Sequence, residues 1–177
     1  MDPLEVREVL ESFRIITDTR EHRTPEARRR LNAFGVPTEI ATLNYGDYSA
    51  NVTIDGKPLY DISSRISPAC VIERKMGLDE LAGNLTRGRD RFRREFERAT
   101  ENAARVYLLI ENATYEGILN HRYMSRLNEN AFLASVIAWQ VRYGITVVMC
   151  KADSSGRIIK EILYRDIKER LERGEYG

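Results

Sequence analysis

Short apolar runs bounded by turn residues alternate along the chain with longer stretches whose apolar residues recur at helical spacing. The short runs predict β-strands and the longer stretches predict amphipathic helices. The predicted strands cover residues 13–17, 36–43, 71–75, 105–111 and 145–150. The predicted helices cover residues 3–12, 25–34, 78–85, 90–104, 131–143 and 156–173, and the polar segment 112–128 is predicted to be irregular. We find no internal repeat and no linker, so we expect one domain over residues 1–177.

A turn signal marks an extra hairpin between two of these strands. Ile54-Asp55-Gly56-Lys57 is typical of a tight β-hairpin, because Asp-Gly suits the positive φ angles of such turns. We therefore expect an inserted hairpin or flap over about residues 51–68. Pro68 limits the start of the strand that follows.

The predicted helix 131–143 has two apolar faces. One comprises Phe132, Val136, Trp139 and Tyr143, and the other comprises Leu133, Ile137 and Val141. A helix that is apolar over so much of its surface requires burial on two sides. Two interpretations follow: the helix lies deep in the domain, or one face forms a homodimer interface.

Composition narrows the class of protein. The chain is 42% hydrophobic and 31% charged, which indicates a folded globular domain rather than a disordered one. No apolar run approaches the roughly 20 residues of a membrane-spanning helix, and residues 1–12 lack the apolar core of a signal peptide. Cys70 and Cys150 lie in separate apolar runs, as reduced core thiols do, so we expect an intracellular protein, cytoplasmic or nuclear. A zinc site is not expected, because His22 and His121 lack partners at ligand spacing.

The net charge of +1 does not by itself indicate nucleic acid, but the charge is unevenly distributed. On the predicted helix 90–104, Phe92 and Phe96 belong to a core-facing stripe. Arginines follow similar spacing on another face: Arg87, Arg91, Arg94 and Arg98. These side chains either form a solvated face or contact a row of DNA phosphates. For Arg28, Arg29 and Arg30 on the predicted helix 25–34, the solvated face is the favoured interpretation.

The stretch Val71-Ile72-Glu73-Arg74-Lys75 ends an apolar run with three charged residues. On a strand, Glu73 and Lys75 share one face because side chains alternate. A carboxylate and an amine at this spacing, beside other carboxylates, suit the hydrolysis of a phosphodiester with the help of a divalent ion. Charged residues at a strand end are also commonly only solvated, so this stretch alone carries little weight.

Two further polar elements precede this stretch: Asp18-Thr19-Arg20-Glu21 and Tyr45-Gly46-Asp47-Tyr48. Together with Glu73-Arg74-Lys75-Met76-Gly77-Leu78-Asp79, they form an ordered set that resembles the nuclease domain of the XPF family of structure-specific endonucleases. That family carries D-x-R-E, G-D-Y and E-R-K-x-x-x-D elements in this order. Arg91-Phe92 and the Leu-Leu-Ile-Glu that ends the strand 105–111 add to the resemblance, which covers roughly residues 13–170.

The resemblance implies a restriction-endonuclease-like α/β fold, with a central mixed sheet flanked by helices. It also implies Mg²⁺- or Mn²⁺-dependent cleavage of DNA, at branches such as flaps and forks, and oxygen ligands without cysteine or histidine suit such hard ions. Asp47 and Glu73 would be the main metal ligands, Asp18 a third, and Lys75 the catalytic lysine. The polar site would be completed by Arg20, Glu21, Arg74 and Asp79. We expect Arg74 to brace Asp79 or another carboxylate, because it points away from Glu73 on a regular strand.

Two features depart from the family pattern. The segment between Asp47 and Glu73 is long, so a flap there could gate the DNA groove. The 177 residues contain no recognisable helix-hairpin-helix or helicase part. The family's preference for a particular DNA structure is therefore the property that can least be carried over to this chain. Three alternatives remain: an active endonuclease for branched DNA, a non-catalytic DNA-binding or partner module of the same fold, and a Holliday-junction or restriction-type nuclease.

Overall fold

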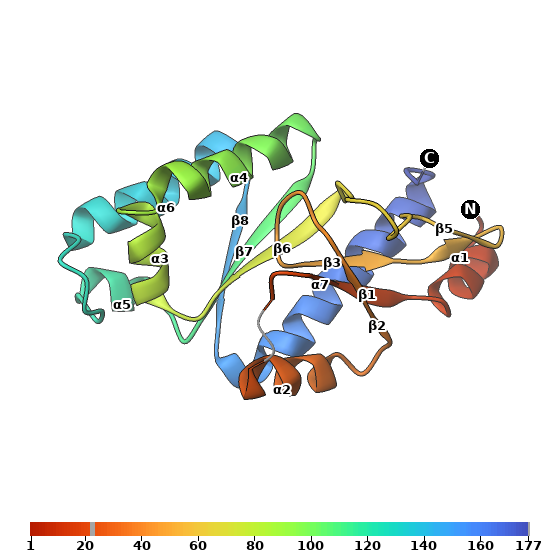
Figure 1. Ribbon diagram of the computed structural model, residues 1–177, viewed down its shortest axis with the longest axis horizontal. Helices are drawn as coiled ribbons and strands as arrows, with labels where there is room; N and C mark the ends of the chain where they lie inside the picture. Colours follow the sequence, from red (N-terminus) through yellow and green to blue (C-terminus); the bar gives the residue numbers. More distant parts are fainter. Residues whose placement is uncertain (22–23, 177) are drawn as a thin grey trace.

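A six-stranded mixed sheet organises the computed structural model, which describes residues 1–21 and 24–176 (Figure 1). The strands run in the order β2-β1-β3-β6-β7-β8. Their bounds are β1 (Arg14–Asp18), β2 (Thr38–Ala41), β3 (Tyr48–Asn51), β6 (Cys70–Lys75), β7 (Arg105–Glu111) and β8 (Thr146–Cys150). β1 is parallel to β2, β7 is parallel to both β6 and β8, and β3 is antiparallel to both of its neighbours. The predicted mixed sheet is confirmed.

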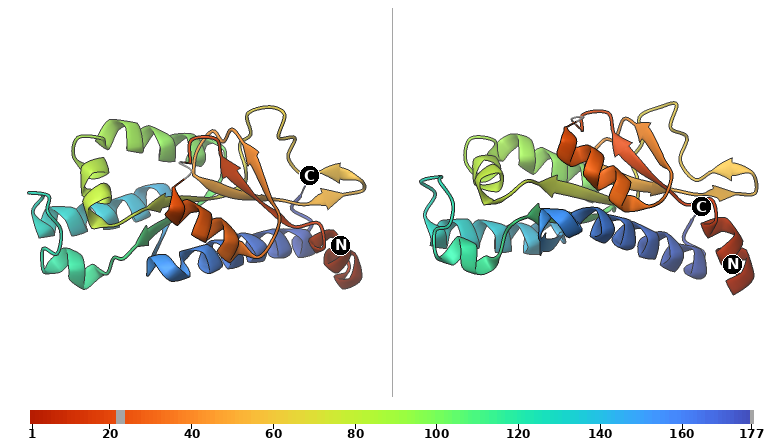
Figure 2. Two further views of the ribbon diagram at one scale, coloured as in Figure 1. Left: turned by 60° about the horizontal axis from the view of Figure 1, so that its bottom comes forward. Right: turned by 90° about the horizontal axis from the view of Figure 1, so that it is seen from below.

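Helices pack on the sheet in two groups, which Figures 1 and 2 show at the two ends of the molecule. The first group is α3 (Leu78–Leu85), α4 (Arg89–Glu101), α5 (Tyr115–Leu119) and α6 (Glu129–Tyr143). The second group is α1 (Pro3–Leu10), α2 (Pro25–Phe34) and α7 (Ala152–Arg173). Because strand side chains alternate, adjacent residues of β6 enter different cores: Val71 joins the cluster under the first group and Ile72 joins the cluster under the second.

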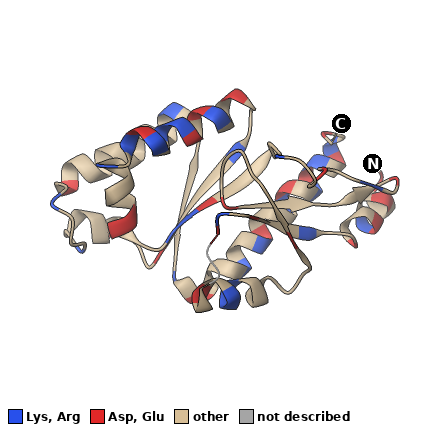
Figure 3. Ribbon diagram, in the orientation of Figure 1, with Lys and Arg blue, Asp and Glu red and all other residues tan. Residues whose placement is uncertain are grey.

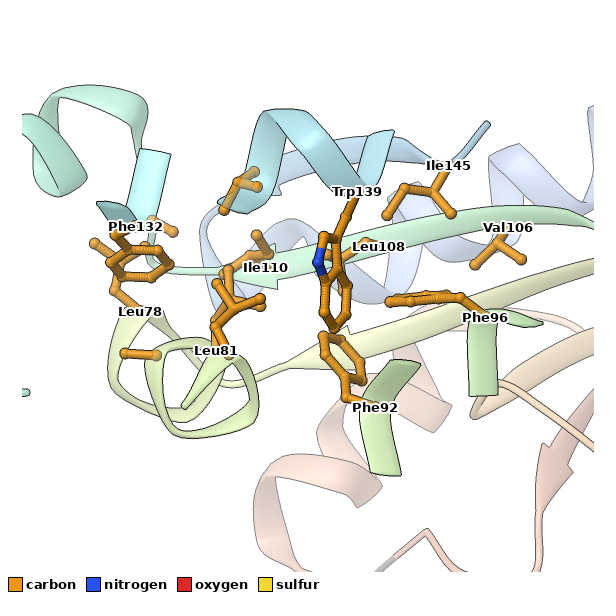
Figure 4. Close-up of a cluster of buried hydrophobic side chains, with 14 of the residues drawn as sticks. Leu78, Leu81, Phe92, Phe96, Val106, Leu108, Ile110, Phe132, Trp139 and Ile145 are labelled. Carbon is orange, nitrogen blue, oxygen red and sulfur yellow. The ribbon is translucent and has the colours of Figure 1, made fainter. Parts of the chain in front are cut away.

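The core under the first group is built around aromatic contacts. Trp139 of α6 packs against Phe92 and Phe96 of α4, with ring centroids 5.1 Å and 5.4 Å apart (Figure 4). One predicted apolar face of α6 is therefore buried within its own domain. The other face is uncovered at two of its three residues, because Ile137 is 43% exposed and Val141 is 81% exposed, whereas Leu133 packs partly buried against the same core.

Several elements differ from the sequence prediction, and three helices illustrate this. The segment predicted to be irregular contains the short helix α5, which Thr114 caps by accepting a hydrogen bond from the Gly117 amide at 2.9 Å. Helix α7 begins at Ala152 rather than at Gly156, and the absence of a side chain at Gly156 is what lets α2 pack there: a Cβ would lie 2.7 Å from the carbonyl oxygen of Arg30. Helix α4 ends at Glu101 rather than at residue 104.

The predicted hairpin is present as β4 (Thr53–Ile54) and β5 (Lys57–Pro58), with positive φ angles at Asp55 and Gly56. It lies beside α1, at the end of the molecule where the termini meet (Figure 1). The Thr53 amide donates a hydrogen bond to the Ser12 hydroxyl at 2.7 Å. Within the described residues, none of residues 51–68 lines the cleft of about 820 Å³ described below, and the expectation that this segment gates or widens a DNA groove stays a prediction.

Among the described residues, no helix combines the length and the apolar character needed to cross a membrane. Cys70 and Cys150 are both free thiols. Cys70 is buried as predicted, whereas Cys150 is only partly buried on the edge strand β8.

Candidate active site

Glu73 and Lys75 lie side by side near the end of β6. Both side chains are buried, and the Lys75 ammonium donates a hydrogen bond to Glu73 Oε1 at 2.6 Å. The predicted shared face is therefore confirmed. The ammonium of Lys75 also lies 4.8 Å from the centre of the Phe92 ring, where the negative face of the ring attracts a cation. These two contacts fix a charged side chain inside the fold.

Asp47 reaches β6 through a turn that only glycine permits. Gly46 has a φ of +75°, and a Cβ at this position would lie 2.7 Å from Val71 Cβ, so both backbone conformation and space require glycine. The Asp47 amide donates to the Ile72 carbonyl at 2.8 Å, and Asp47 Oδ2 accepts from the Arg74 amide at 2.8 Å. The carboxylate of Asp47 is thus fixed directly beside the strand that carries Glu73.

Burial and neighbouring charges shift the pKa values of both carboxylates and of Lys75. Burial raises the pKa of Asp47 to about 6, although attraction to Lys75 opposes this shift. Burial and then repulsion from Asp47 raise the pKa of Glu73 well above its usual value. Burial lowers the pKa of Lys75, but Glu73 and Asp47 outweigh burial and leave that pKa raised, so the amine stays charged. Two acids that repel each other form a site that a cation stabilises.

Mg²⁺ or Mn²⁺ fits the donor atoms at this position. Among the described residues, Glu73 Oε2 is buried without a hydrogen-bond partner, and Asp47 supplies a second carboxylate. The described residues contain no group of three or more His, Cys, Asp or Glu side chains arranged for a metal ion. The protein would therefore provide Asp47 and Glu73, and water or a phosphate would provide the remaining ligands, as is common for Mg²⁺.

Asp18 does not join this pair. Its Oδ1 accepts hydrogen bonds from the Arg20 amide and the Arg20 Nε at 2.9 Å and 2.6 Å, and its Oδ2 accepts from the Leu43 amide at 2.7 Å. Both oxygens thus fix the turn after β1. The structure therefore gives Asp18 a different position from the third-ligand position that the sequence predicts.

A second charged network lies beside the pair and includes Arg74. The Arg74 guanidinium bonds Glu111 at 3.2 Å and Glu21 at 3.4 Å. Arg30 bonds the same two carboxylates at 3.2 Å and 3.1 Å. Tyr48 donates its hydroxyl hydrogen to Glu21 at 2.6 Å. Two arginines and two glutamates thus form a closed ring, which we call the four-charge ring, and the expectation that Arg74 braces another carboxylate is confirmed.

A cleft of about 820 Å³ opens over both groups. The residues that line it come largely from the turn after β1, from β6 and from helices α2 and α4, and Figure 3 marks the lysine and arginine positions of these segments in blue. The lining cations are Arg20, Arg29, Arg30, Arg74, Lys75 and Arg91. Acids line the cleft as well: Glu21, Glu26, Glu80, Glu95, Glu111 and Asp153, besides Asp47 and Glu73. The cleft therefore carries mixed charge, and its arginines and Lys75 are the groups that suit contact with a polyanion.

The family follows from a match over most of the chain. A family model, the ERCC4 domain, matches residues 17–162, which include every motif described above. The chain belongs to the ERCC4-domain family. The XPF resemblance inferred from the three motifs is thereby confirmed. No protein with a curated description matches the chain.

Two solved structures have the fold of this ERCC4 domain. One is XPF from Aeropyrum pernix, which is 21% identical with a TM-score of 0.61 and aligns with 86% of this chain and 61% of that one. The other is XPF from the same organism in complex with DNA, which is 24% identical with a TM-score of 0.61 and aligns with 89% of this chain and 66% of that one. The ERCC4 domain thus spans under two thirds of the length of these XPF chains.

Asp79 of the ERCC4 domain lies on the first turn of α3 and faces a loop rather than the acidic pair. Its Oδ1 accepts hydrogen bonds from the amides of Met124 and Ser125 at 2.6 Å and 3.3 Å. The expected pairing of Asp79 with Arg74 is therefore wrong, because Arg74 is engaged by Glu21 and Glu111.

The predicted arginine face is present in part. Arg91, Arg94 and Arg98 are exposed on α4, and Arg91 lines the cleft. Arg98 donates from Nε to the Asn44 carbonyl at 3.1 Å. Arg87 is also exposed, but it precedes α4, which begins at Arg89, so the row on this helix has three members rather than four.

Sequence reasoning missed Arg30, Tyr48 and Glu111 as site residues. Arg30 was assigned to a solvated face, yet it is buried. The signal that could have identified it is its helical spacing with the buried residues Ala27 and Phe34. Glu111 ends a buried parallel strand, where an acid is unexpected unless it is paired.

Proposed function

We propose that this ERCC4 domain is a divalent-metal-dependent endonuclease that hydrolyses phosphodiester bonds in DNA at branches such as flaps and forks. The observation that carries the proposal is the pair of carboxylates, the buried Glu73 and the partly buried Asp47, with an unpartnered oxygen on Glu73 and the charged Lys75 beside them. A site of this kind costs folding stability, and it has a physical purpose where it binds a cation.

The chemistry would use these groups in distinct roles. Asp47 and Glu73 would hold Mg²⁺ or Mn²⁺, which supplies an activated water and neutralises charge on the leaving oxygen. Lys75 would hold its ammonium against the phosphate, where negative charge develops in the transition state. Arg20 and Arg91, which line the same cleft, would contact neighbouring phosphates, and Arg94 and Arg98 would extend that row along α4. Arg87 would add a contact just before the helix.

The choice of DNA rests on the family. One of the structures with this fold is XPF in complex with DNA. The preference for a branch rests on the motif resemblance to structure-specific endonucleases. The remaining motif residues, Asp18, Glu21, Arg74 and Asp79, would support the site by fixing its turns and the four-charge ring.

Cleavage assays with Glu73→Gln test the proposal. End-labelled flap, fork, four-way junction and blunt duplex DNA are incubated with Mg²⁺ or with a chelator. We expect wild type to cut flaps and forks only with the ion, and Glu73→Gln to lose at least about 100-fold in rate while DNA affinity changes little. Glu161→Gln, a substitution at an exposed glutamate on α7, should cut like wild type and serves as the matched control.

Three outcomes would contradict parts of the proposal. Equal cleavage by Glu73→Gln at saturating Mg²⁺ would remove Glu73 as a ligand. A wild type that cuts none of the substrates, with Asp47→Ala binding them equally well, would favour the non-catalytic DNA-binding module. Cleavage confined to four-way junctions or to unbranched duplex would favour the Holliday-junction or restriction-type alternative.

We also propose that two copies of the chain associate through α6. The supporting observation is the uncovered apolar face of this helix, where Ile137 and Val141 are exposed although the opposite face is in the core.

A further inference from the structure

The loop between α5 and α6, residues 120–128, carries an exposed apolar side chain that belongs neither to the core nor to the lining of the cleft. Met124 at its tip is 90% exposed, more than any other large apolar side chain in the described part of the chain. The loop lies at the end of the molecule formed by the first helix group (Figure 1). Single exposed apolar side chains are common on protein surfaces, so Met124 is informative only together with the fixed loop and the charges around it.

This loop is fixed rather than loose. Tyr123 is buried and donates its hydroxyl hydrogen to the Leu127 carbonyl at 2.7 Å. The His121 ring stacks on Tyr123 at 4.2 Å and contacts the Ser125 carbonyl at 3.0 Å, although its backbone has a positive φ of 49°. Asp79 binds the amides of Met124 and Ser125. A strained residue held by several contacts indicates that the loop conformation is specified.

Charge surrounds the exposed methionine. Arg122 and Arg126 are both exposed, whereas the intervening Tyr123 points into the core, so alternate residues of the loop face solvent. The segment 120–128 contains no acid. The neighbouring acids are engaged: Asp79 binds backbone amides and Glu129 contacts His121 at 3.3 Å. The loop therefore presents one apolar side chain between two cations.

The loop is joined to the rim of the cleft. Asp79, which holds the loop, follows Lys75 by four residues on the same short connection. Between them, Met76 lines the cleft and is 63% exposed. The loop is thereby held against α3, the helix that follows the cleft-lining Met76.

We propose that the loop 120–128 is a DNA-binding element that recognises the boundary between duplex and single strand next to the cleaved phosphate. Met124 packs on a base face that is exposed only at such a boundary, as apolar side chains do when they insert beside a base step. Arg122 and Arg126 contact the flanking phosphates. Asp79 acts as a positioning residue, because it fixes this loop to the helix that follows Lys75. The inference rests on the proposed function and adds a source of branch preference.

Binding experiments in the Glu73→Gln background test the inference, because DNA then stays uncut in Mg²⁺. Fluorescence anisotropy compares a fork with a blunt duplex of the same sequence. We expect Met124→Ala to weaken binding to the fork about 5-fold or more while binding to the duplex changes less than about 2-fold. Arg122→Gln with Arg126→Gln should reduce the slope of log affinity against log salt by about 1.5. A 2-aminopurine base at the boundary should brighten on binding, and Met124→Ala should abolish that rise.

Matched controls come from exposed residues elsewhere. Leu4→Ala is the control for methionine, and Arg165→Gln with Arg173→Gln is the control for the two arginines. If the parent binds DNA and wild type cuts it, but the loop variants match these controls, the loop inference fails and the proposed function stands. If wild type neither binds nor cuts DNA, both fail. A change in oligomeric state by light scattering, with DNA binding unchanged, would also overturn the loop inference.

Discussion

At the scale of single residues, the site is defined by acids placed where they cost stability. Burial raises the pKa of both Asp47 and Glu73, repulsion from Asp47 raises that of Glu73 further, and Lys75 compensates for only part of that cost. Gly46 allows the approach, since any larger residue would collide with Val71. The metal-free protein therefore carries a local repulsion that the proposed ion would remove.

We predict that Asp47→Asn stabilises the metal-free protein above about pH 6 and has little effect near pH 4. Burial raises the pKa of Asp47 to about 6 from 3.8. Between these values the folded state retains a proton that the unfolded chain has released, so stability falls as the pH rises through this window and stays lower above it. Asparagine removes that penalty, so we expect a gain of about 1 to 3 kcal/mol at pH 8.

Urea denaturation in a chelator at pH 8 and pH 4 measures this gain. Asp55→Asn, an exposed site in the hairpin turn, should change neither value. Equal stability of wild type and Asp47→Asn at pH 8 would show that the ionised Asp47 carboxylate does not destabilise the folded protein.

At the scale of elements, the four-charge ring connects segments far apart in the sequence. Arg30 on α2 and Arg74 on β6 share the carboxylates of Glu21, after β1, and Glu111, at the end of β7. The ring is balanced, with two positive and two negative charges, and its members are mostly buried. It therefore fixes α2 and the turn after β1 against the two central strands that carry the site.

We predict that removing one charged member of the ring lowers the free energy of unfolding. Removing a neighbouring member of opposite charge as well should restore part of that loss. Arg30→Met leaves Glu111 and Glu21 to share one arginine, so it should cost about 3 to 5 kcal/mol of unfolding free energy. Glu111→Gln should be costly for the same reason. Combined with Arg30→Met, it should cost less than the sum of the two, because charge balance returns.

Urea unfolding of the four proteins in this cycle gives the coupling energy. The exposed pair Glu26 and Arg29 on the same helix is the matched control, and Glu26→Gln with Arg29→Met should have no measurable effect. Additive losses in the ring would show that its members act independently.

The sequence alone was sufficient to predict the position of those residues whose placement follows from local spacing. Glu73 and Lys75 on one strand face and the two apolar faces of α6 follow from periodicity, and the turn at Gly46 follows from its composition. The ring was not predictable, since Arg30 and Glu111 are 81 residues apart and only the fold brings them together. Asp18 and Asp79 carry motif positions, but a motif does not specify which backbone amides a carboxylate will bind. Helix α5 was missed because five residues are too few to show a period.

At the scale of the whole molecule, the large apolar residues of α6 are divided between core and solvent. Trp139 is buried against α4, so it belongs to the domain core and a substitution there would test folding rather than association. Ile137 and Val141 are on the uncovered face, and their exposure makes them suitable sites for testing the proposed homodimer.

We predict that wild type scatters light with the mass of two chains and that Val141→Glu scatters with the mass of one. Val141 is 81% exposed, so a charge there should leave the fold intact. Burying that charge in an apolar interface would cost desolvation free energy and so oppose association. An unchanged urea midpoint at low protein concentration checks the fold. Leu4→Glu, at an exposed leucine on α1, should keep the mass of two chains. A wild type with the mass of one chain would exclude the interface.

Helix α7 has a consequence for how the protein is made. It packs on α1, α2 and β3, and its residues Ile159, Leu163, Ile167 and Leu171 complete the second core together with Val6, Ile15 and Tyr48. On the ribosome, the first third of the chain must therefore wait until Ala152–Arg173 has emerged before it can bury that surface. At typical rates of synthesis the wait is on the order of 10 s. During this time the nascent chain exposes an apolar surface, and chaperones that shield such surfaces would determine how much folded protein is recovered.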